Sequence, residues 1–293
     1  MTELFGIPLN ALMGQLLLGL MNGAFYALLS LGLAIIFGLL NVINFMHGAQ
    51  FMMGAFVAWM LLNWLGINYW CALVIAPLVV GLSGALIERL LLRHLYRLDH
   101  LYGMLLTFGL TLIVEGLFRK GFGASGLPYA NVIPGGFDAG LMFVPYYRAW
   151  VVAVSLVVCL STWLLIERTK LGSYLRAATE NPKMVRAFGV NVPLMVTLTY
   201  AFGAALAALA GVMAAPIYQV SPLMGSNLVI LVFAVVVIGG MGSILGSIVT
   251  GFGLGVVEGA TKVFYPEAST VAIFVVMIIV LMVRPAGLFG KRK

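Results

Sequence analysis

L-G-S-Y-L-R-A-A-T-E-N-P-K-M-V-R-A-F-G-V-N-V-P, from Leu171 to Pro193, is the stretch around which the rest of the chain is organised. It is the longest polar stretch with helix signals in a sequence that otherwise avoids charge. Asn181 followed by Pro182 predicts a helix start, because the Asn side chain can accept from an unpaired amide and proline suits the first helical position. Gly189 predicts the helix end, since glycine readily turns left-handed.

The predicted helix is short and amphipathic, with about two turns. Its spacing places Met184, Val185 and Phe188 on one side and Lys183 and Arg186 on another. A helix of this kind between two membrane spans suits a docking surface for another protein. It suits equally a helix that lies among lipid headgroups, and the pattern alone leaves both interpretations open.

The composition is that of a polytopic membrane protein. Of the 293 residues, 63% are hydrophobic and 9% are charged, and the mean hydropathy is +1.12. Too few polar side chains remain to cover a water-facing surface. The apolar runs exceed the roughly 20 residues that a helix needs to cross the hydrocarbon, and alternating strands of about ten residues are absent. We therefore expect an all-α fold with about eight to ten transmembrane helices in a single domain, residues 1–293.

Nine apolar runs are candidates for the crossings. They are 11–38, 48–66, 70–92, 102–118, 148–166, 195–215, 228–241, 246–264 and 269–284. The first is long enough to be tilted or broken, and the seventh is short.

The basic residues predict the orientation. Twelve of the 16 Lys and Arg fall on one side of this topology and four on the other, which is the bias of cytoplasmic loops. The twelve are Arg89, Arg93, Arg97, Arg168, Lys170, Arg176, Lys183, Arg186, Arg284, Lys291, Arg292 and Lys293; the four are Arg119, Lys120, Arg148 and Lys262. The segment 168–193 and the C-terminus are thus expected in the cytoplasm, and the glycine- and proline-rich loop 120–147 outside, where we expect it to pack as turns.

Other classes of function find little support. The net charge is +7, but the basic residues lie at span ends rather than in a stripe interleaved with aromatic residues. Nucleic acid is therefore not an expected partner. Cys71 and Cys159 lie in apolar runs and resemble small core residues more than a disulfide, a metal site or a nucleophile. The N-terminal ten residues have no basic region, so we expect no cleaved signal peptide.

Two segments interrupt apolar helices without introducing charge. The first, from Asn41 to Gly54, reads N-V-I-N-F-M-H-G-A-Q-F-M-M-G, and the second, from Ile238 to Ser247, reads I-G-G-M-G-S-I-L-G-S. Paired glycine-interrupted segments in two halves point to internal repeats beside a transport pathway. The pathway candidates are Asn41, Asn44, His47, Gly48, Gly239, Gly240, Gly242 and Ser243. Helix–helix hydrogen bonding is the alternative role for the polar members.

The glycine cluster does not form a nucleotide site. Gly240, Gly242 and Gly246 lack both the dinucleotide spacing and the Lys-Ser/Thr of a phosphate-binding loop. ATP hydrolysis would therefore have to belong to another polypeptide. Small residues at four-residue spacing, at 203–215 and 251–259, predict close helix packing instead.

Two carboxylates within apolar runs are candidate proton relays. Glu115 lies one turn before Arg119, and Glu258 one turn before Lys262. An i, i+4 ion pair is the simpler expectation for each of them.

Five motifs in order resemble the permease subunits of branched-chain amino-acid ABC importers. They are N-x-x-N-F-x-H-G at 41–48, E-R-L-L-L-R at 88–93 with T-F-G-L-T at 107–111, R-A-A-x-x-N at 176–181 with F-G-V at 188–190, G-G-x-G-S at 239–243, and R-P-x-G-L-x-G at 284–290. The short N-terminus is closer to the H-type permease subunit than to its longer M-type companion. Arg93-His94 departs from the arginine-proline of related sequences, and Arg176-Ala177-Ala178 matches the Glu-Ala-Ala signature of other importer classes only loosely.

The resemblance implies a type II-like, heteromeric importer of the bacterial inner membrane with two pseudo-repeated halves. Its partners would be a second homologous permease, two cytoplasmic ATPases that bind ATP and Mg²⁺, a periplasmic substrate-binding protein and membrane lipid. This chain would bind no cofactor or metal and would not be an enzyme. Residues 171–193 would dock on an ATPase, through Arg176, Ala177, Asn181, Met184, Arg186, Phe188 and Gly189. A permease of the same family for urea, short amides or other amino acids is the near alternative, and a stand-alone proton-coupled carrier or channel the distant one.

Overall fold

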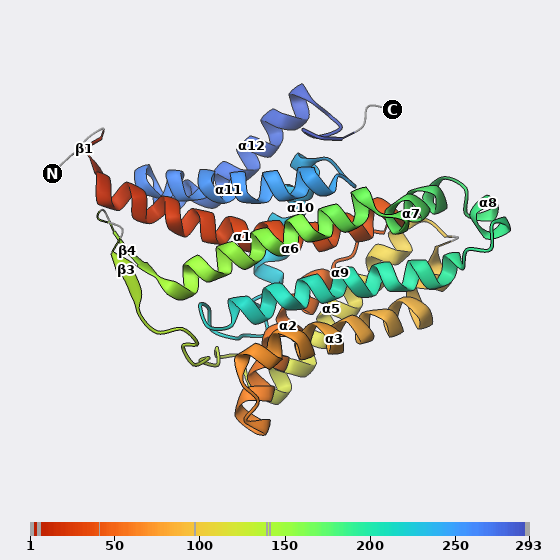
Figure 1. Cartoon of the computed structure of the whole chain (residues 1–293), viewed down its shortest axis with the longest axis horizontal. Coiled ribbons are helices and arrows are strands. Elements are labelled where there is room, and N and C mark those ends of the chain that lie inside the picture. Colours follow the sequence, from red (N-terminus) through yellow and green to blue (C-terminus); the bar gives the residue numbers. More distant parts are fainter. Residues whose placement is uncertain are drawn as a thin grey trace. The chain divides into compact units, whose positions relative to one another are not determined.

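Helices make up most of the chain in the computed structural model, which describes residues 3–4, 7–40, 42–96, 98–138, 140 and 142–290 (Figure 1). The helices are α1 (Leu9–Leu40), α2 (Met46–Leu65), α3 (Tyr69–Ile87), the π-helix η1 (Glu88–Leu92), α4 (Arg93–Leu95), α5 (His100–Phe122), α6 (Tyr146–Arg168), α7 (Lys170–Glu180), α8 (Pro182–Ala187), α9 (Val192–Ala214), α10 (Ser226–Gly239), α11 (Ile244–Phe264), the 3₁₀ helix η2 (Pro266–Ala268) and α12 (Ser269–Val283). Two short antiparallel hairpins join β1 (Glu3–Leu4) to β2 (Ile7–Pro8) and β3 (Gly136–Asp138) to β4 (Phe143–Pro145).

Each of the nine apolar runs is a helix, which confirms the prediction of a helical polytopic membrane protein. Within the described residues, eight helices are long and apolar enough to cross a membrane: 9–38, 46–65, 69–95, 100–122, 146–168, 192–214, 244–264 and 266–283. The first run is one unbroken helix, α1. The seventh run forms α10, which has 14 residues and is shorter than a full crossing of roughly 20.

The chain divides into two compact units. Unit 1 comprises residues 1–30, 131–160 and 231–293, and unit 2 comprises residues 31–130 and 161–230. The long helices α1 and α6 and the shorter α10 contribute to both units.

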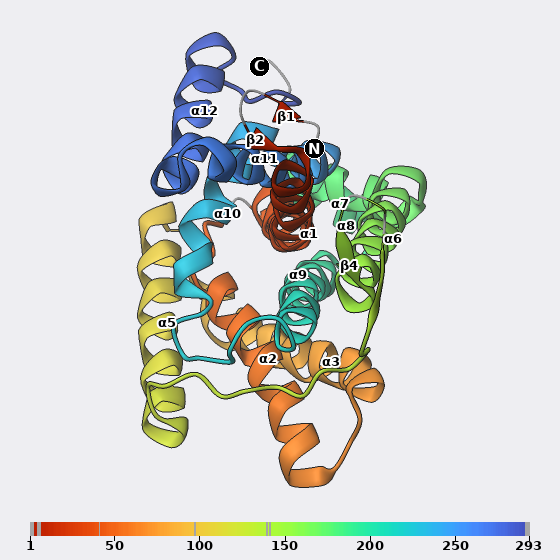
Figure 2. The same cartoon turned by 90° about the vertical axis from the view of Figure 1, so that its left-hand side faces the viewer.

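The core of unit 2 is a three-helix packing of α2, α3 and α9 (Figure 2). The helices approach closely because glycine and alanine line the seam: a Cβ on Gly211 would lie 2.0 Å from the carbonyl oxygen of Phe51, and one on Gly54 would lie 2.5 Å from the Cα of Ala208. This confirms that the small residues of 203–215 serve helix packing. Lipid tails are as apolar as leucine, so close van der Waals contact is the main attraction available between such helices.

Unit 1 uses the same device between α1 and α11. A Cβ on Gly255 would lie 2.3 Å from the carbonyl oxygen of Gly19, and one on Gly251 would lie 2.6 Å from the backbone of Ala27. Gly251, Gly255 and Gly259 therefore form the predicted close-packing face, and its partner is α1.

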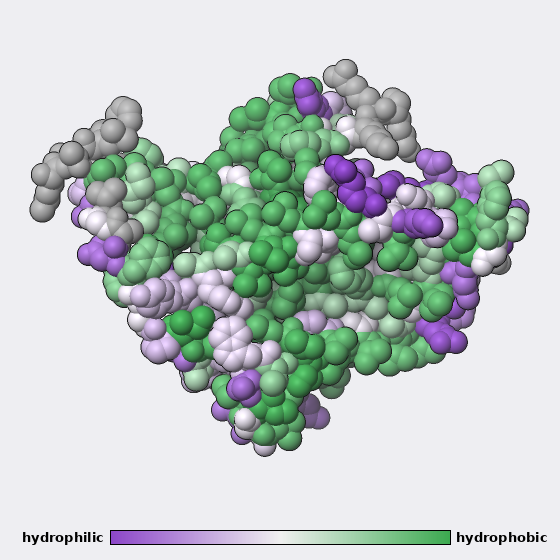
Figure 3. Space-filling model, in the orientation of Figure 1, coloured by the Kyte–Doolittle hydropathy of each residue, from purple (hydrophilic) through white to green (hydrophobic). Residues whose placement is uncertain are grey.

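Hydrophilic side chains gather on the surface of α7 and α8 (Figure 3). In Figure 3 most of the visible surface over the helices is hydrophobic, whereas hydrophilic residues gather around α7 and α8. Loop 120–147 includes the β3–β4 hairpin, and its earlier part is held to unit 2. Leu127 pairs with Val220, and the indole of Trp59 donates to the carbonyl of Pro128 at 3.2 Å.

The glycine seam yields a stability prediction. Gly211→Ala should lower the free energy of unfolding by about 1–3 kcal/mol, because the added methyl group meets backbone atoms of α2 that cannot yield. Thermal unfolding of the full chain in detergent measures this change. Gly116→Ala on α5 is the matched control: its Cβ would meet nothing within 4 Å, so stability should stay equal or rise slightly. Equal melting temperatures for Gly211→Ala and the parent chain would contradict the close contact.

Candidate functional site: the coupling segment and the helix breaks

The polar segment forms two consecutive helices, α7 and α8, joined by Asn181. The Asn181 side chain accepts from the amide of Met184 at 3.1 Å, and Pro182 begins α8, as predicted. Gly189 ends the turn in the left-handed conformation, with φ of +81°.

The next helix also begins with a side-chain cap. Asn191 caps α9, accepting from Leu194 N–H at 3.2 Å. The sequence predicted α8 but not α7, although Leu171, Leu175 and Ala178 of α7 follow a helical spacing.

Helix α8 presents two large apolar side chains to the surroundings. Phe188, just after its end, is 81% exposed and Met184 is 59% exposed. Of the three residues predicted to share one side, Met184 and Phe188 are exposed, whereas Val185 is buried and anchors the helix. Arg186 is also exposed.

The first part of the segment is tied to the end of α6. Arg176 forms a salt bridge with Glu167 at 2.9 Å, and its guanidinium also donates to the carbonyl of Ile166 at 3.4 Å. The carbonyl of Ala177 accepts from Asn181 N–H at 2.9 Å and closes the last turn of α7. Of the seven predicted docking residues, Arg176 and Ala177 thus hold the segment together, and Met184, Arg186 and Phe188 face outward.

A buried carboxylate connects the start of α9 with the end of α3. Glu88 is completely buried and accepts from the hydroxyls of Thr197 at 2.5 Å and Tyr96 at 3.2 Å. Arg93 pairs with Glu88 at 3.4 Å and also donates to the carbonyl of Pro193 at 3.3 Å. Because α9 follows α8 directly, these bonds join the polar segment to the core of unit 2.

The environment of Tyr96 keeps its hydroxyl a hydrogen-bond donor. Burial, and then the charge of Glu88, raise the pKa of Tyr96 well above its ordinary value. Glu88 lies at the first residue of η1, where the wider π-helical turn interrupts the regular helix. Arg93 and Tyr96 lie within eight residues of Glu88, whereas its buried partner Thr197 lies 109 positions later in the chain.

The first helix break is closed by polar side chains within unit 2. Asn41, one of the pathway candidates, lies outside the described residues. Asn44 accepts from Met46 N–H at 3.1 Å, and the hydroxyl of Thr107 on α5 accepts from Phe45 N–H at 3.2 Å. A Cβ on Gly48 would lie 2.8 Å from the carbonyl oxygen of Gly225, so α2 packs there against the turn before α10.

Next to this break lies a polar cluster with almost no exposure to solvent. Asn44, His47, Gln50 and Tyr200 are each at most 1% exposed. Gln50 and Asn44 lie beside the Tyr200 hydroxyl, yet none of these three side chains completes its hydrogen bonds within the described residues. Asn44 and His47 therefore point inward, as expected of polar groups at membrane depth.

The second break, in unit 1, is a turn built on glycine. Gly240 and Gly242 have φ of +101° and +85°, a conformation that favours glycine. The Ser243 hydroxyl then accepts from Gly246 N–H at 3.1 Å and caps α11. Gly239 is buried, and its Cβ would meet the backbone of Gly246 at 2.7 Å.

The segment after α12 covers this second break. The amides of Leu288 and Phe289 donate to the carbonyls of Ile238 and Gly239, at 2.8 and 3.1 Å. A Cβ on Gly240 would lie 2.4 Å from the amide nitrogen of Gly290. The glycines of two sequence motifs, 239–243 and 284–290, are thus explained together, a contact that sequence spacing did not reveal.

The two membrane carboxylates have different partners. Glu258 forms the predicted salt bridge with Lys262 at 2.5 Å and accepts from the hydroxyl of Tyr26 at 2.6 Å. The predicted Glu115–Arg119 pair is wrong: Glu115 is buried and accepts from the hydroxyl of Ser226, and within the described residues it has no salt bridge. The described residues also contain no group of three His, Cys, Asp or Glu that could hold a metal ion.

The Glu88 network can be tested by a double-mutant cycle. Arg93→Gln should lower the free energy of unfolding by about 1–3 kcal/mol, because it leaves a buried carboxylate short of a charged donor. The double variant Arg93→Gln with Glu88→Gln should lose less free energy of unfolding than the two single variants lose together. The difference, which is the coupling energy, should be roughly 0.5–3 kcal/mol. Denaturant unfolding in detergent measures all three variants. Lys183→Gln, an exposed cation of α8, should change stability by less than about 0.5 kcal/mol. Strict additivity would show that the two side chains do not interact.

Comparison with known proteins identifies the family. Residues 15–281 match the family described as branched-chain amino acid transport system / permease component. The permease protein BraD of Pseudomonas aeruginosa, of a high-affinity branched-chain amino acid transport system, is 30% identical over 292 residues, covering 94% of this chain and 95% of BraD. LivH of Escherichia coli K12 is 28% identical over the same shares, and LivM of the same organism is 30% identical over 90% of this chain and 67% of LivM.

The match includes the capped helix α8, both glycine breaks and all but the last two residues of α12, in chain order. It therefore extends over both compact units rather than over one of them. The chain belongs to the family of branched-chain amino acid transport permease components, and it is a LivH-type permease.

Proposed function

We propose that this chain is the transmembrane permease subunit of an ATP-driven ABC importer for branched-chain, hydrophobic amino acids. BraD and LivH carry this substrate class in their names, and they cover nearly the whole chain. The pathway would form together with a second homologous permease; the similarity to both LivH and LivM supports such a pair. Two cytoplasmic ATPases and a periplasmic binding protein would complete the importer, which we place in the bacterial inner membrane.

The observation that carries the energy-coupling part of the proposal is the exposed apolar pair on α8. Phe188 and Met184 project from a capped helix that leads directly into α9. Exposed aromatic and methionine side chains at the centre of a small surface are typical of protein contacts. In this proposal α8 inserts into a cleft on an ATPase, and α7, α8 and the C-terminus are cytoplasmic, in agreement with the distribution of Lys and Arg.

The path from α8 into the membrane follows covalent and polar connections. Asn191 fixes the start of α9, and Thr197, Arg93 and Glu88 link that start to the end of α3. A movement of α8 would therefore carry α9 and α3 together as a packed pair. Rigid-body movement of packed helices is the common means of alternating access.

Charge reversal on α8 tests the docking role. In proteoliposomes that contain the complete importer and its binding protein, Arg186→Glu should reduce ATP-driven leucine uptake by about tenfold or more, because one desolvated charge contact at an interface is worth at least roughly 1.4 kcal/mol. Insertion of the subunit, measured by its amount in the membrane, should not change. Lys120→Glu makes the same charge change at the opposite end of the spans and should leave uptake within about twofold. Normal uptake by Arg186→Glu would count against docking through α8.

The chain without partners tests the alternative of an independent carrier. Reconstituted alone, it should neither hydrolyse ATP nor concentrate leucine, since the sequence holds no phosphate-binding loop. The measurement is radiolabelled leucine uptake with and without an imposed proton gradient. Uptake driven by that gradient would overturn the proposal and direct attention to Glu115 and Glu258. Comparable uptake of urea or short amides by the complete importer would instead revise the substrate class.

A further inference from the structure

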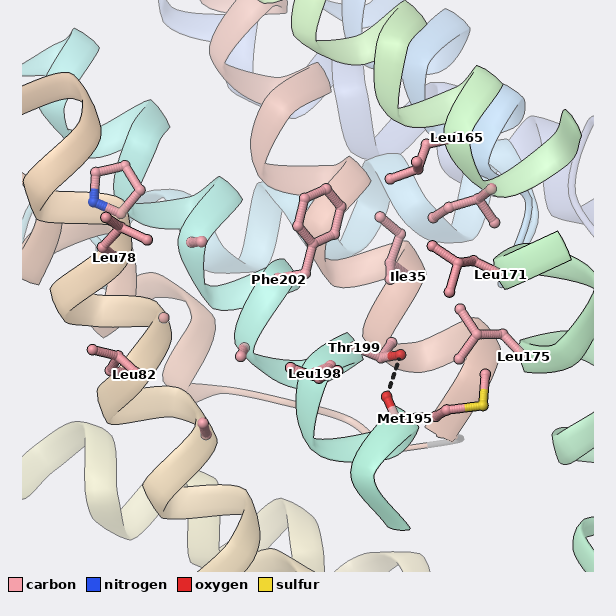
Figure 4. Close-up of a pocket in the computed structure, with 16 residues that line it drawn as sticks. Ile35, Leu78, Leu82, Leu165, Leu171, Leu175, Met195, Leu198, Thr199 and Phe202 are labelled. Carbon is pink, nitrogen blue, oxygen red and sulfur yellow. Dashed lines mark hydrogen bonds between the residues drawn. The ribbon is translucent and has the colours of Figure 1, made fainter. Parts of the chain in front are cut away.

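A groove of about 490 Å³ lies in unit 2 between α3, α9 and the junction of α6 with α7 (Figure 4). Leu78 and Leu82 line it from α3, Leu198 and Phe202 from α9, and Leu165 and Leu171 from the α6–α7 junction. Its volume lies within the roughly 300–1,000 Å³ of ligand pockets. The side chains of Leu82, Leu171 and Leu198 are each more than half exposed, so the groove is open along its side.

The chemistry of the groove suits hydrocarbon and does not suit an amino acid. The hydroxyl of Thr199 is the one side-chain polar group among its lining residues, and it already donates to the carbonyl of Met195 at 2.8 Å. A zwitterion placed there would leave its ammonium and carboxylate groups unpaired, at a cost of several kcal/mol. The groove is therefore distinct from a path for the transported substrate.

One end of the groove is basic. Arg89, which is exposed, follows the lining residue Ala85 by four positions and lies at the second residue of η1. Arg168 and Lys170, also exposed, lie between the lining residues Ile166 and Leu171. Within the described part of the chain, none of these three cations forms a salt bridge. The nearby Arg176 is partly neutralised by Glu167.

From this juxtaposition we propose that the groove binds one acyl chain of an anionic phospholipid, whose phosphate lies among Arg89, Arg168 and Lys170. A phospholipid has an apolar chain and a negative charge in one molecule, so its chain can fill the groove while its phosphate lies at the basic end. A helix of another protein would fill the apolar part but would have to bring carboxylates for three cations. Clusters of basic residues at span ends attract anionic lipids at about 1 kcal/mol per residue.

The occupied groove would support the helix junction that carries the polar segment. Gly172 packs so tightly against α6 that a Cβ there would collide with the carbonyl of Ile166, so the α6–α7 junction beside the groove is a close backbone contact. A lipid chain in the groove would contact α3, α9 and α7 at the same time. Lipid binding of this kind does not depend on which substrate is transported.

Native mass spectrometry of the purified full chain in detergent, titrated with palmitoyl-oleoyl phosphatidylglycerol or phosphatidylcholine, tests the proposal. We expect phosphatidylglycerol to bind at least about tenfold more tightly, and Arg168→Gln with Lys170→Gln to remove about this tenfold preference. Leu198→Trp, at an exposed position that tolerates a large side chain, should weaken both lipids by filling the groove.

The paired change Arg119→Gln with Lys120→Gln is the control, because it removes two cations at the opposite end of the spans. It should leave both affinities unchanged within about twofold. Equal affinity for the two lipids in the parent chain, or equal losses in the control and in Arg168→Gln with Lys170→Gln, would overturn the proposal. So would unchanged lipid binding by both Leu198→Trp and a second groove-filling variant, Ala85→Phe.

Discussion

Hydrocarbon offers no hydrogen-bonding partner to a peptide group, and this constraint explains the unusual parts of the structure. Every helix that stops at membrane depth must have its free amides and carbonyls satisfied by protein. The first break uses the side chains of Asn44 and Thr107. The second uses the backbone amides of Leu288 and Phe289. Residues of the sequence motifs at 41–48, 107–111, 239–243 and 284–290 thus take part in the hydrogen bonds that close the two breaks.

Close helix packing and buried polar bonds have different roles inside unit 2. The glycine seam between α2 and α9 gives contact without direction, since smooth faces can slide or rotate. The bonds of Glu88 to Thr197 and Arg93 add a fixed register between α9 and the end of α3. Burying a carboxylate is costly, and three donors are required to offset that cost. These bonds hold α3 and α9 in one position relative to each other.

The sequence predicted features that depend on short-range chemistry. Hydropathy located all nine apolar helices, and Asn181, Pro182 and Gly189 located α8 and its ends. Sequence analysis failed where the partner lies far along the chain. Glu115 accepts a hydrogen bond from Ser226 rather than pairing with Arg119. Gly240 and Gly287 lie in close backbone contact. Helix α7 was missed although Leu171 and Leu175 follow a helical spacing; no side-chain cap marks its start, in contrast to α8. The exposure of Phe188 and the burial of Val185 also depend on the neighbouring helices, which a helical wheel does not include.

The closure of the second break has a consequence for biogenesis. The carbonyls of Ile238 and Gly239 accept from amides about fifty residues later in the chain. During synthesis α10 and α11 enter the membrane before residues 284–290 have left the ribosome, so these carbonyls need temporary partners. Water, the insertion machinery or a neighbouring helix must supply them until α12 has been inserted. The order in which the ribosome delivers the chain therefore leaves this turn without its final hydrogen bonds until residues 288 and 289 have emerged.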